Sequence, residues 1–234
     1  MNPYVDAATG TPFNKLGIAD RVELAKVEYA LTDLRIAELK LSPPKGDFDL
    51  PHLRAVHRHI FQDIYAWAGK DRTLNMSKRD PVEPWWQSAF ARPEHIAMID
   101  QSVREDLRTW NRLKGLGSAD FAAKIAVVYV KWNHMHPFPE GNGRATQTFL
   151  SQLAREAGYE LNYAKVDPKA WNMAAARSMP QVNVREPLIT RPADAQFIHR
   201  VFQQIVAPSR AHHLEKAAQH TISPSVSRGP GYER

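Results

Sequence analysis

The chain of 234 residues carries 31 lysine and arginine residues against 25 acidic ones, a formal net charge of +6, and it contains no cysteine. Without cysteine it can form neither disulfide bonds nor thiol-based catalytic sites, and it suits a reducing compartment. No apolar stretch reaches the ~18 residues of a membrane-spanning helix, and the basic residues form no nucleic-acid-binding motif. We therefore expect a cytoplasmic globular protein, with no nucleic acid and no membrane among its partners.

The first part of the chain predicts an irregular arm followed by two helices. Residues 1–13 combine glycine, proline and small polar residues, which is typical of an arm without regular structure. One helix is expected at about 20–40, capped by Asp20, and a second at about 51–67, ended by Gly69. The apolar faces of these helices are expected to contain Val22, Ala25, Leu31, Leu34 and Ala37 in the first, and Leu53, Val56, Ile60, Phe61 and Ile64 in the second.

The helical rhythm stops between residues 72 and 92. Thr73–Met76 has the composition of a short strand, and several prolines follow it, so a hairpin or protruding loop is predicted. Trp85 and Trp86 would be costly to leave in water. We expect them to fold back onto the body of the protein rather than to bind a partner.

Helical patterns resume after residue 92. Helices are expected at about 93–113, 118–133 with Ser118 as cap, 142–157, 168–178 and 191–206. The helix at 118–133 has apolar residues on several sides and should be buried. Residues 209–234 are weakly patterned and predict a mobile tail. One helical domain accounts for the rest.

The nine residues His136-Pro-Phe-Pro-Glu-Gly-Asn-Gly-Arg144 connect two of these helices and concentrate chemically active groups. A glycine-rich turn that opens a helix leaves backbone N–H groups unpaired and suited to holding phosphate. Arg144 adds a fixed positive charge, Glu140 a hard oxygen ligand for Mg²⁺, and His136 a proton acceptor near neutral pH. The pattern predicts a polyphosphate and metal site with a base beside it.

This segment resembles the signature of the Fic family, His-Pro-Phe-x-(Asp/Glu)-Gly-Asn-Gly-Arg-x-x-Arg, except that the last arginine is Gln147 here. Weaker similarity extends over about residues 14–205. It includes Asn14–Ile18, Leu50–Arg54, Ile60–Gly69 and the flap segment Thr73–Lys78.

The resemblance implies an all-α, Fic-type helical bundle with a short β-hairpin flap over the active site. It places a Fic domain at 14–208, with the flap at about 72–92 and the active-site loop at 134–147. Most active members transfer AMP from ATP to a hydroxyl group on a target protein. The resemblance thus implies a bacterial protein adenylyltransferase acting on a Ser, Thr or Tyr side chain, without settling whether the protein is delivered into another cell.

The family's roles carry over onto matching positions. His136 would take the proton of the target hydroxyl, and Glu140 would bind Mg²⁺ on the α- and β-phosphates. The phosphates would be held by backbone and amide donors of the glycine-rich turn and by the charge of Arg144 on the β-phosphate; the turn residues are Gly141, Asn142 and Gly143. The flap would dock an extended target segment through Met76, Ser77 and Lys78.

Gln147 is the departure from the signature. The family's arginine there holds the γ-phosphate, and glutamine brings no charge. Three consequences are left open: weaker binding of the γ-phosphate, compensation by Lys78 or Arg79, or a donor without a γ-phosphate.

Other donors and other roles also stay open. The same scaffold could transfer UMP or a phosphocholine-type group, or it could be a weakened Fic fold that only binds. Phosphate transfer is disfavoured because the Doc branch carries Ala-Asn-Lys where this chain keeps Gly-Asn-Gly. No inhibitory Ser/Thr-x-x-x-Glu-Gly/Asn motif occurs, so the resemblance implies restraint by a separate antitoxin-like protein.

Two further sets of residues are secondary candidates. Trp171 and Asn172 are candidates for the edge of the nucleotide base, although core packing is the favoured role of Trp171. The histidines beside the motif and elsewhere are expected to be structural or solvated rather than metal ligands; these are His57, His59, His134, His212 and His213.

Overall fold

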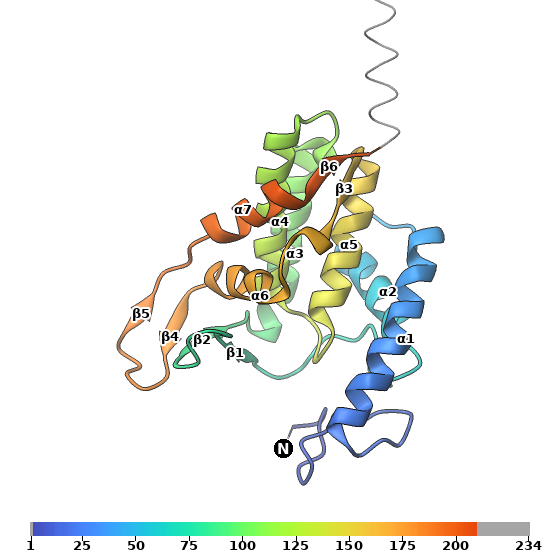
Figure 1. Ribbon diagram of the computed structural model, residues 1–234, viewed down its shortest axis with the longest axis vertical. Coiled ribbons are helices and arrows are strands. Elements are labelled where there is room, and N and C mark those ends of the chain that lie inside the picture. Colours follow the sequence, from blue (N-terminus) through green and yellow to red (C-terminus); the bar gives the residue numbers. More distant parts are fainter. Residues whose placement is uncertain (1, 210–234) are drawn as a thin grey trace, which may run out of the picture.

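Helices dominate the described part of the chain, residues 2–209, in the computed structural model (Figure 1). In chain order they are α1 (Arg21–Leu41), α2 (Leu50–Phe61), α3 (Ile96–Thr109), α4 (Ser118–Met135), α5 (Asn142–Glu156), α6 (Pro168–Arg177) and α7 (Gln196–Ile205). Short 3₁₀ turns lie at Pro93–His95, Asn111–Leu113 and Tyr163–Lys165. The predicted tail lies outside the described residues from residue 210 onward, and so do His212 and His213.

The predicted helices are therefore confirmed, with changes at their ends. Asp20 caps α1 as expected, because its side chain accepts a hydrogen bond from the Glu23 N–H at 2.7 Å. Ser118 is not a cap: the cap position of α4 is Gly117, and Ser118 is already helical. The last helix begins at Gln196 instead of residue 191, because a strand occupies 190–191.

The core is built around α4, which contacts α3, α5 and α7. On the other side of α5, α2 packs between α5 and α1. The predicted stripe of α2 is confirmed, since its apolar members from Leu53 to Ile64 are fully buried. The packing of α4 against α5 matters for function, because the two helices fix both ends of the loop that joins them.

The predicted apolar face of α1 is wrong for all of its residues except Leu31, which packs half-buried against the core. Val22 and Leu34 are 65% and 58% exposed, whereas the buried residues are Leu24, Glu28, Thr32 and Leu39. Polar side chains are buried on this face because it covers Arg144 on α5, which the site below describes. The spacing of hydrophobic residues does not reveal a helix face that is buried because it pairs with a buried charge.

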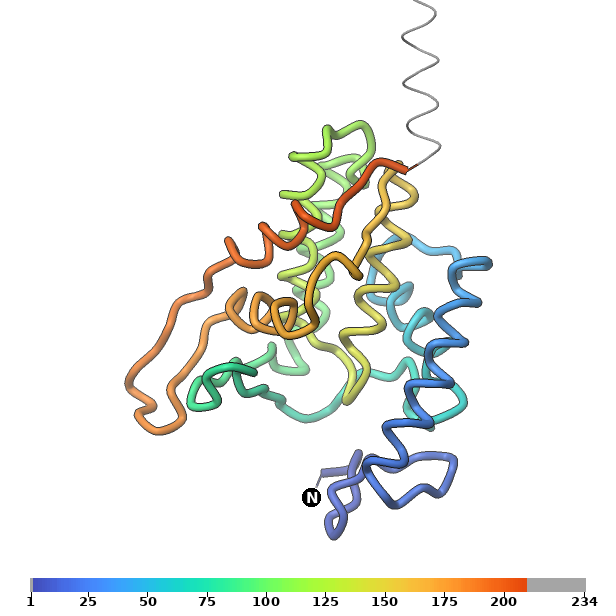
Figure 2. Tube along the Cα trace, in the orientation of Figure 1, coloured from blue at the N-terminus to red at the C-terminus, as the bar shows by residue number. Residues whose placement is uncertain are grey.

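The hairpin predicted at 72–92 is confirmed, but it belongs to a larger sheet. Strands β1 (Ser77–Arg79) and β2 (Trp86–Ala89) pair antiparallel, so the first strand begins at Ser77 rather than within 73–76. Strand β2 also pairs with β4 (Gln181–Asn183), and β4 pairs with β5 (Thr190–Arg191). The trace in Figure 2 shows this second hairpin beside the flap although the two are far apart in sequence.

A second small sheet pairs β3 (Tyr159–Leu161) with β6 (Val206–Pro208), the strand that follows the last helix. The N-terminal arm is irregular, as predicted, apart from one bridge between Val5 and Pro12. Among the described helices, none is both long and apolar enough to cross a bilayer.

Candidate active site

His136 stands where α4 ends and the loop begins. Its backbone N–H still donates to the Trp132 carbonyl at 3.1 Å, but its φ of 43° is left-handed, which turns the chain sharply out of the helix. Left-handed geometry is unusual for a residue other than glycine and has to be held by its surroundings. Here the imidazole stacks on Phe90, with ring centroids 3.6 Å apart and planes 8° from parallel.

His57 on α2 holds the loop from beneath. The Gly69 N–H donates to its Nδ1 at 2.9 Å, so the proton lies on Nε2 and is donated to the Glu140 carbonyl oxygen at 3.0 Å. The ring stacks on Phe138 with centroids 3.8 Å apart, and Phe138 is fully buried. His57 is thus structural, and burial lowers its pKa to about 3.

Arg72 ties the flap to the same loop. Within residues 2–209, its buried guanidinium donates only to backbone carbonyls, namely those of Leu74 and Ala91 at the two ends of the flap and those of Met135 and His136. Its own N–H donates to the Pro137 carbonyl at 2.7 Å. The base of the flap and the turn that carries His136 are therefore held by one side chain.

The glycine-rich turn opens α5 as predicted. Gly141 has a φ of 80°, and a Cβ there would lie 2.2 Å from the Phe61 ring, so only glycine fits. The first backbone bond into the helix runs from the Ala145 N–H to the Gly141 carbonyl. No side chain of residues 2–209 caps the N–H groups of Asn142, Gly143 and Arg144, whereas the Gly141 N–H donates to the Glu140 carboxylate. A Cβ at Gly143 would meet nothing within 4 Å, so the turn borders open space there.

The side-chain amide of Asn142 closes the active-site loop. It accepts from the Phe138 N–H at 2.9 Å and donates to the Phe138 carbonyl at 2.7 Å. We expected this amide to hold phosphate, but these two bonds use it to close the loop. The anion-binding groups that remain at this position are the backbone N–H groups.

Arg144 lies at the interface of α5 with α1. Its guanidinium forms an ion pair with Glu28 and donates to the Thr32 hydroxyl at 3.0 Å, both on α1. It lies 4.8 Å from the centroid of the Phe61 ring, and Tyr65 donates to the same Glu28 carboxylate. In this arrangement Arg144 joins α5 to α1 and does not line the cavity described next.

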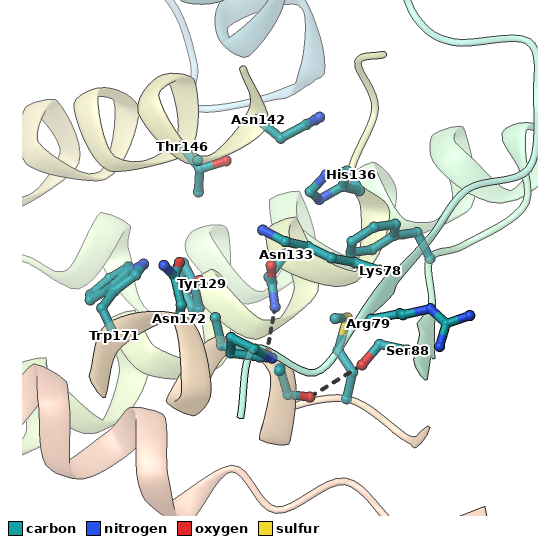
Figure 3. A pocket seen from close by; sticks show the side chains of 16 residues that line it. Lys78, Arg79, Ser88, Tyr129, Asn133, His136, Asn142, Thr146, Trp171 and Asn172 are labelled. Carbon is teal, nitrogen blue, oxygen red and sulfur yellow. Dashed lines mark hydrogen bonds between the residues drawn. The ribbon is translucent and has the colours of Figure 1, made fainter. Parts of the chain in front are cut away.

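A cavity lies between the start of α5, α6 and the flap (Figure 3). It brings together His136, Asn142, Gly143 and Lys78 from the predicted site, and also Trp171 and Asn172. Trp171 packs edge-on against Tyr129 and Phe202 as well, so both of its suggested roles agree with its position. The lining residues that the sequence did not suggest include Phe90, Tyr129, Asn133 and Thr146.

The other predicted site residues lie outside this lining. Glu140 is exposed, and its carboxylate accepts from the Gly141 N–H at 2.9 Å. Gln147 is half-buried one turn further along α5, and its carbonyl accepts from the hydroxyls of Ser151 and Tyr163. Met76 precedes β1, and Ser77 accepts from the Gln87 side chain on the neighbouring strand.

The electrostatic surroundings keep His136 neutral. Burial, together with the positive charges of Lys78 and Arg72, lowers its pKa to about 3. A neutral imidazole can accept a proton, whereas a charged one cannot. The site therefore offers a base beside unpaired N–H groups, at the mouth of a cavity.

Sequence comparison identifies the family to which this architecture belongs. A model of the Fic/DOC family matches residues 47–154. The Escherichia coli K12 protein named Probable protein adenylyltransferase Fic is 35% identical over 174 residues, which cover 74% of this chain and 82% of that relative. The chain belongs to the Fic/DOC family. Protein adenylyltransferase VbhT of Bartonella schoenbuchensis is also 35% identical, over 76% of this chain but only 36% of VbhT.

Solved structures of Fic domains share the fold. The ADP-bound N-terminal Fic domain of a VirB-translocated Bep effector protein from Bartonella quintana superposes with a TM-score of 0.77 and 25% identity, over 90% of this chain and 97% of that one. BepC of Bartonella tribocorum, solved with AMPPNP, has a TM-score of 0.76 and 24% identity, over 88% and 97%. The all-α bundle with a hairpin flap is therefore confirmed.

Proposed function

We propose that this protein is an adenylyltransferase that transfers AMP from ATP to a hydroxyl side chain of a target protein, and that residues 14–208 form its Fic domain. The observation that carries the proposal is the neutral His136 imidazole at a cavity bordered by the N-terminus of α5. The names of the relatives and the nucleotides bound in two Fic domains support ATP as the donor.

The chain's own groups suit each part of this reaction. His136 would accept the proton as the target oxygen forms its bond to the α-phosphorus and the bond to the leaving pyrophosphate breaks. The N–H groups of Gly141, Asn142 and Gly143 would hold phosphate oxygens that gain charge in that step, that of Gly141 in place of its present bond to the Glu140 carboxylate. These roles follow the predicted positions, with the Asn142 backbone in place of its side chain.

Mg²⁺ fits the donor set at one position. No group of three His, Cys, Asp or Glu side chains within residues 2–209 could hold an ion by itself. Mg²⁺ is commonly held by one or two carboxylates together with substrate phosphates, and the exposed carboxylate of Glu140 lies next to the phosphate-binding turn. Bound there, Mg²⁺ would offset negative charge on the phosphates.

The partners are proposed from the same reasoning. Strand β1 is the edge of its sheet, so its outer side can pair with an extended target segment; Met76, Ser77 and Lys78 are the proposed docking residues. A small antitoxin-like protein is the proposed inhibitor, since the chain lacks the family's inhibitory motif. The proposed location is the bacterial cytoplasm, where such a partner would act.

Labelled ATP tests this function. Incubation with Mg²⁺ and bacterial lysate should label a protein from ATP carrying the label at the α-phosphate, and not from ATP labelled at the γ-phosphate. His136→Ala should reduce labelling about 10²–10⁴-fold. His134→Ala, two residues earlier and outside the lining, is the matched control and should retain it.

Other outcomes identify the alternatives. Labelling from the γ-phosphate would indicate phosphate transfer, and labelling from UTP or CDP-choline alone would indicate another donor. The weakened binding module is favoured by Gln147. It would be indicated if neither the natural chain nor Gln147→Arg labels any protein while the nucleotide still binds.

A further inference from the structure

The cavity contains less positive charge than the motif predicts. Arg144 is paired with Glu28 on the far side of α5, and residue 147 is an uncharged glutamine. Among the residues lining the cavity in the described chain, the cationic side chains are those of Lys78 and Arg79, both on β1 of the flap. Any phosphate chain bound in this cavity must find its side-chain counter-charge mainly on one of these two residues.

The two flap cations point in different directions. Successive side chains of a strand lie on opposite faces, so Lys78 points to one side of β1 and Arg79 to the other. Figure 3 shows the Lys78 amine reaching toward the interior of the cavity, whereas the Arg79 guanidinium turns away from it. Arg79 also donates to the Pro84 carbonyl at 3.0 Å, within the flap itself.

Lys78 is unpaired in this position. Within residues 2–209 it forms no ion pair, although the neighbouring flap residues Asp80 and Glu83 pair with Arg177 and Arg191. After burial, its charge is the next largest cause of the lowered pKa of His136, which places the ammonium close to the imidazole. An unpaired ammonium and the N-terminus of α5 thus face one cavity and favour a polyanion there.

We propose that Lys78 binds the phosphate chain of the nucleotide and supplies the charge that the family's second motif arginine would supply at position 147. This inference rests on the proposed function, and it adds a role for Lys78 beyond target docking. It also explains how a chain with Gln147 can hold a nucleoside di- or triphosphate. Of the three consequences left open for Gln147, it selects compensation by the flap.

Binding measurements on the full chain test the proposal. In calorimetric titrations with Mg²⁺, Lys78→Met should weaken binding of ATP and ADP about tenfold or more, because a charge-assisted contact is lost. Adenosine should bind as before, since it has no phosphate. Arg79→Met is the matched control on the same strand and should change ATP binding less than about twofold, and Lys78→Arg should retain affinity.

A second variant connects Lys78 with position 147. Adding Gln147→Arg to Lys78→Met should restore most of the lost ATP affinity, because it returns a cation to the same phosphates. Failure to restore it would overturn the claim that the two positions serve one phosphate chain. Equal losses for ATP and adenosine, or equal losses in Lys78→Met and Arg79→Met, would overturn the role of Lys78.

Inorganic tripolyphosphate separates this inference from the proposed function. If the natural chain binds tripolyphosphate and Lys78→Met binds it at least about tenfold more weakly, the inference holds even where no AMP transfer is found. If ATP binds and AMP is transferred while Lys78→Met leaves nucleotide affinity unchanged and only raises the KM for the target, the inference fails and the proposed function stands. If the natural chain binds neither tripolyphosphate nor ATP, both fail.

Discussion

Arg144 shows at the scale of a single residue how far a motif determines a role. The signature predicted a phosphate ligand, but Glu28 and Thr32 hold the guanidinium at the interface with α1. Glu28 is 116 residues away in sequence, and nothing in the spacing of α1 marks it as a buried partner. By contrast, the glycine at position 141 could be predicted, because the turn itself demands a left-handed backbone.

We expect Glu28→Gln to destabilise the protein. The change removes the carboxylate that neutralises a largely buried guanidinium and accepts from Tyr65. Leaving one partner of a buried pair uncompensated should lower the free energy of unfolding by about 3 kcal/mol. Chemical denaturation measures this loss, with the exposed Glu23→Gln on the same helix as control. Equal stability of the two variants would show that the pair is not structural.

The lowered pKa of His136 gives a prediction for the pH dependence of the proposed reaction. An ordinary histidine, with a pKa near ~6.5, would lose its capacity as a base below that pH. Because burial and the nearby cations lower the pKa of His136 to about 3, the imidazole stays neutral at pH 5.5. The kcat/KM for ATP should therefore vary less than about twofold between pH 5.5 and 7.5. A fall of about tenfold per pH unit below 6.5 would contradict it.

At the scale of elements, the flap was predicted as a hairpin, but its support was not. Strands β4 and β5 have three and two residues, too few for an alternating pattern. Strand β4 pairs with the flap from about a hundred residues away, and β5 pairs with β4. The anchor is the buried carboxylate of Asp80. It accepts from the Val82 and Glu83 N–H groups, from Gln181 on β4 and from Arg177 at the end of α6.

Asp80→Ala should loosen the flap without unfolding the bundle. It removes the acceptor shared by the side-chain donors of Gln181 and Arg177, which within residues 2–209 keep only Ser88 and Glu83 respectively, and this loss should cost roughly 3 kcal/mol. Amide hydrogen exchange should become faster across 77–89 and stay slow in α4. The exposed Asp33→Ala on α1 serves as control and should leave exchange in the flap unchanged. Unchanged exchange in Asp80→Ala would refute the anchor.

For the whole molecule, the sequence was sufficient for the helical class, the order of the helices and the core stripe of α2, because these depend on local periodicity. It did not predict which face of α1 is buried or how the motif side chains divide between cavity and packing. Those outcomes depend on contacts between distant segments, such as the pairing of Arg144 on α5 with Glu28 on α1. Local patterns cannot encode them.

Burial of His57 should make the whole protein sensitive to acid. The pKa of His57 is about 3 in the folded state and about 6.5 in the unfolded chain. Below pH 6.5 the unfolded chain therefore binds a proton that the folded chain does not bind. Stability is therefore lost as pH falls, by about 2 kcal/mol from this residue at pH 5. Denaturation at pH 7.5 and 5 should show a smaller loss in His57→Gln, whereas His59→Gln should keep the natural loss. An unchanged loss in His57→Gln would contradict this assignment.

The hydrogen bonds of Arg72 have a consequence for how the sequence of the flap can vary among related proteins. Every acceptor it uses is a main-chain oxygen, at Leu74, Ala91, Met135 and His136. Side chains of the flap can thus be exchanged without disturbing the Arg72 hydrogen bonds that fix the flap to the loop carrying His136. Mutations can therefore change which target proteins the flap binds while the reacting groups keep their alignment. Closely related enzymes can in this way come to modify unrelated proteins.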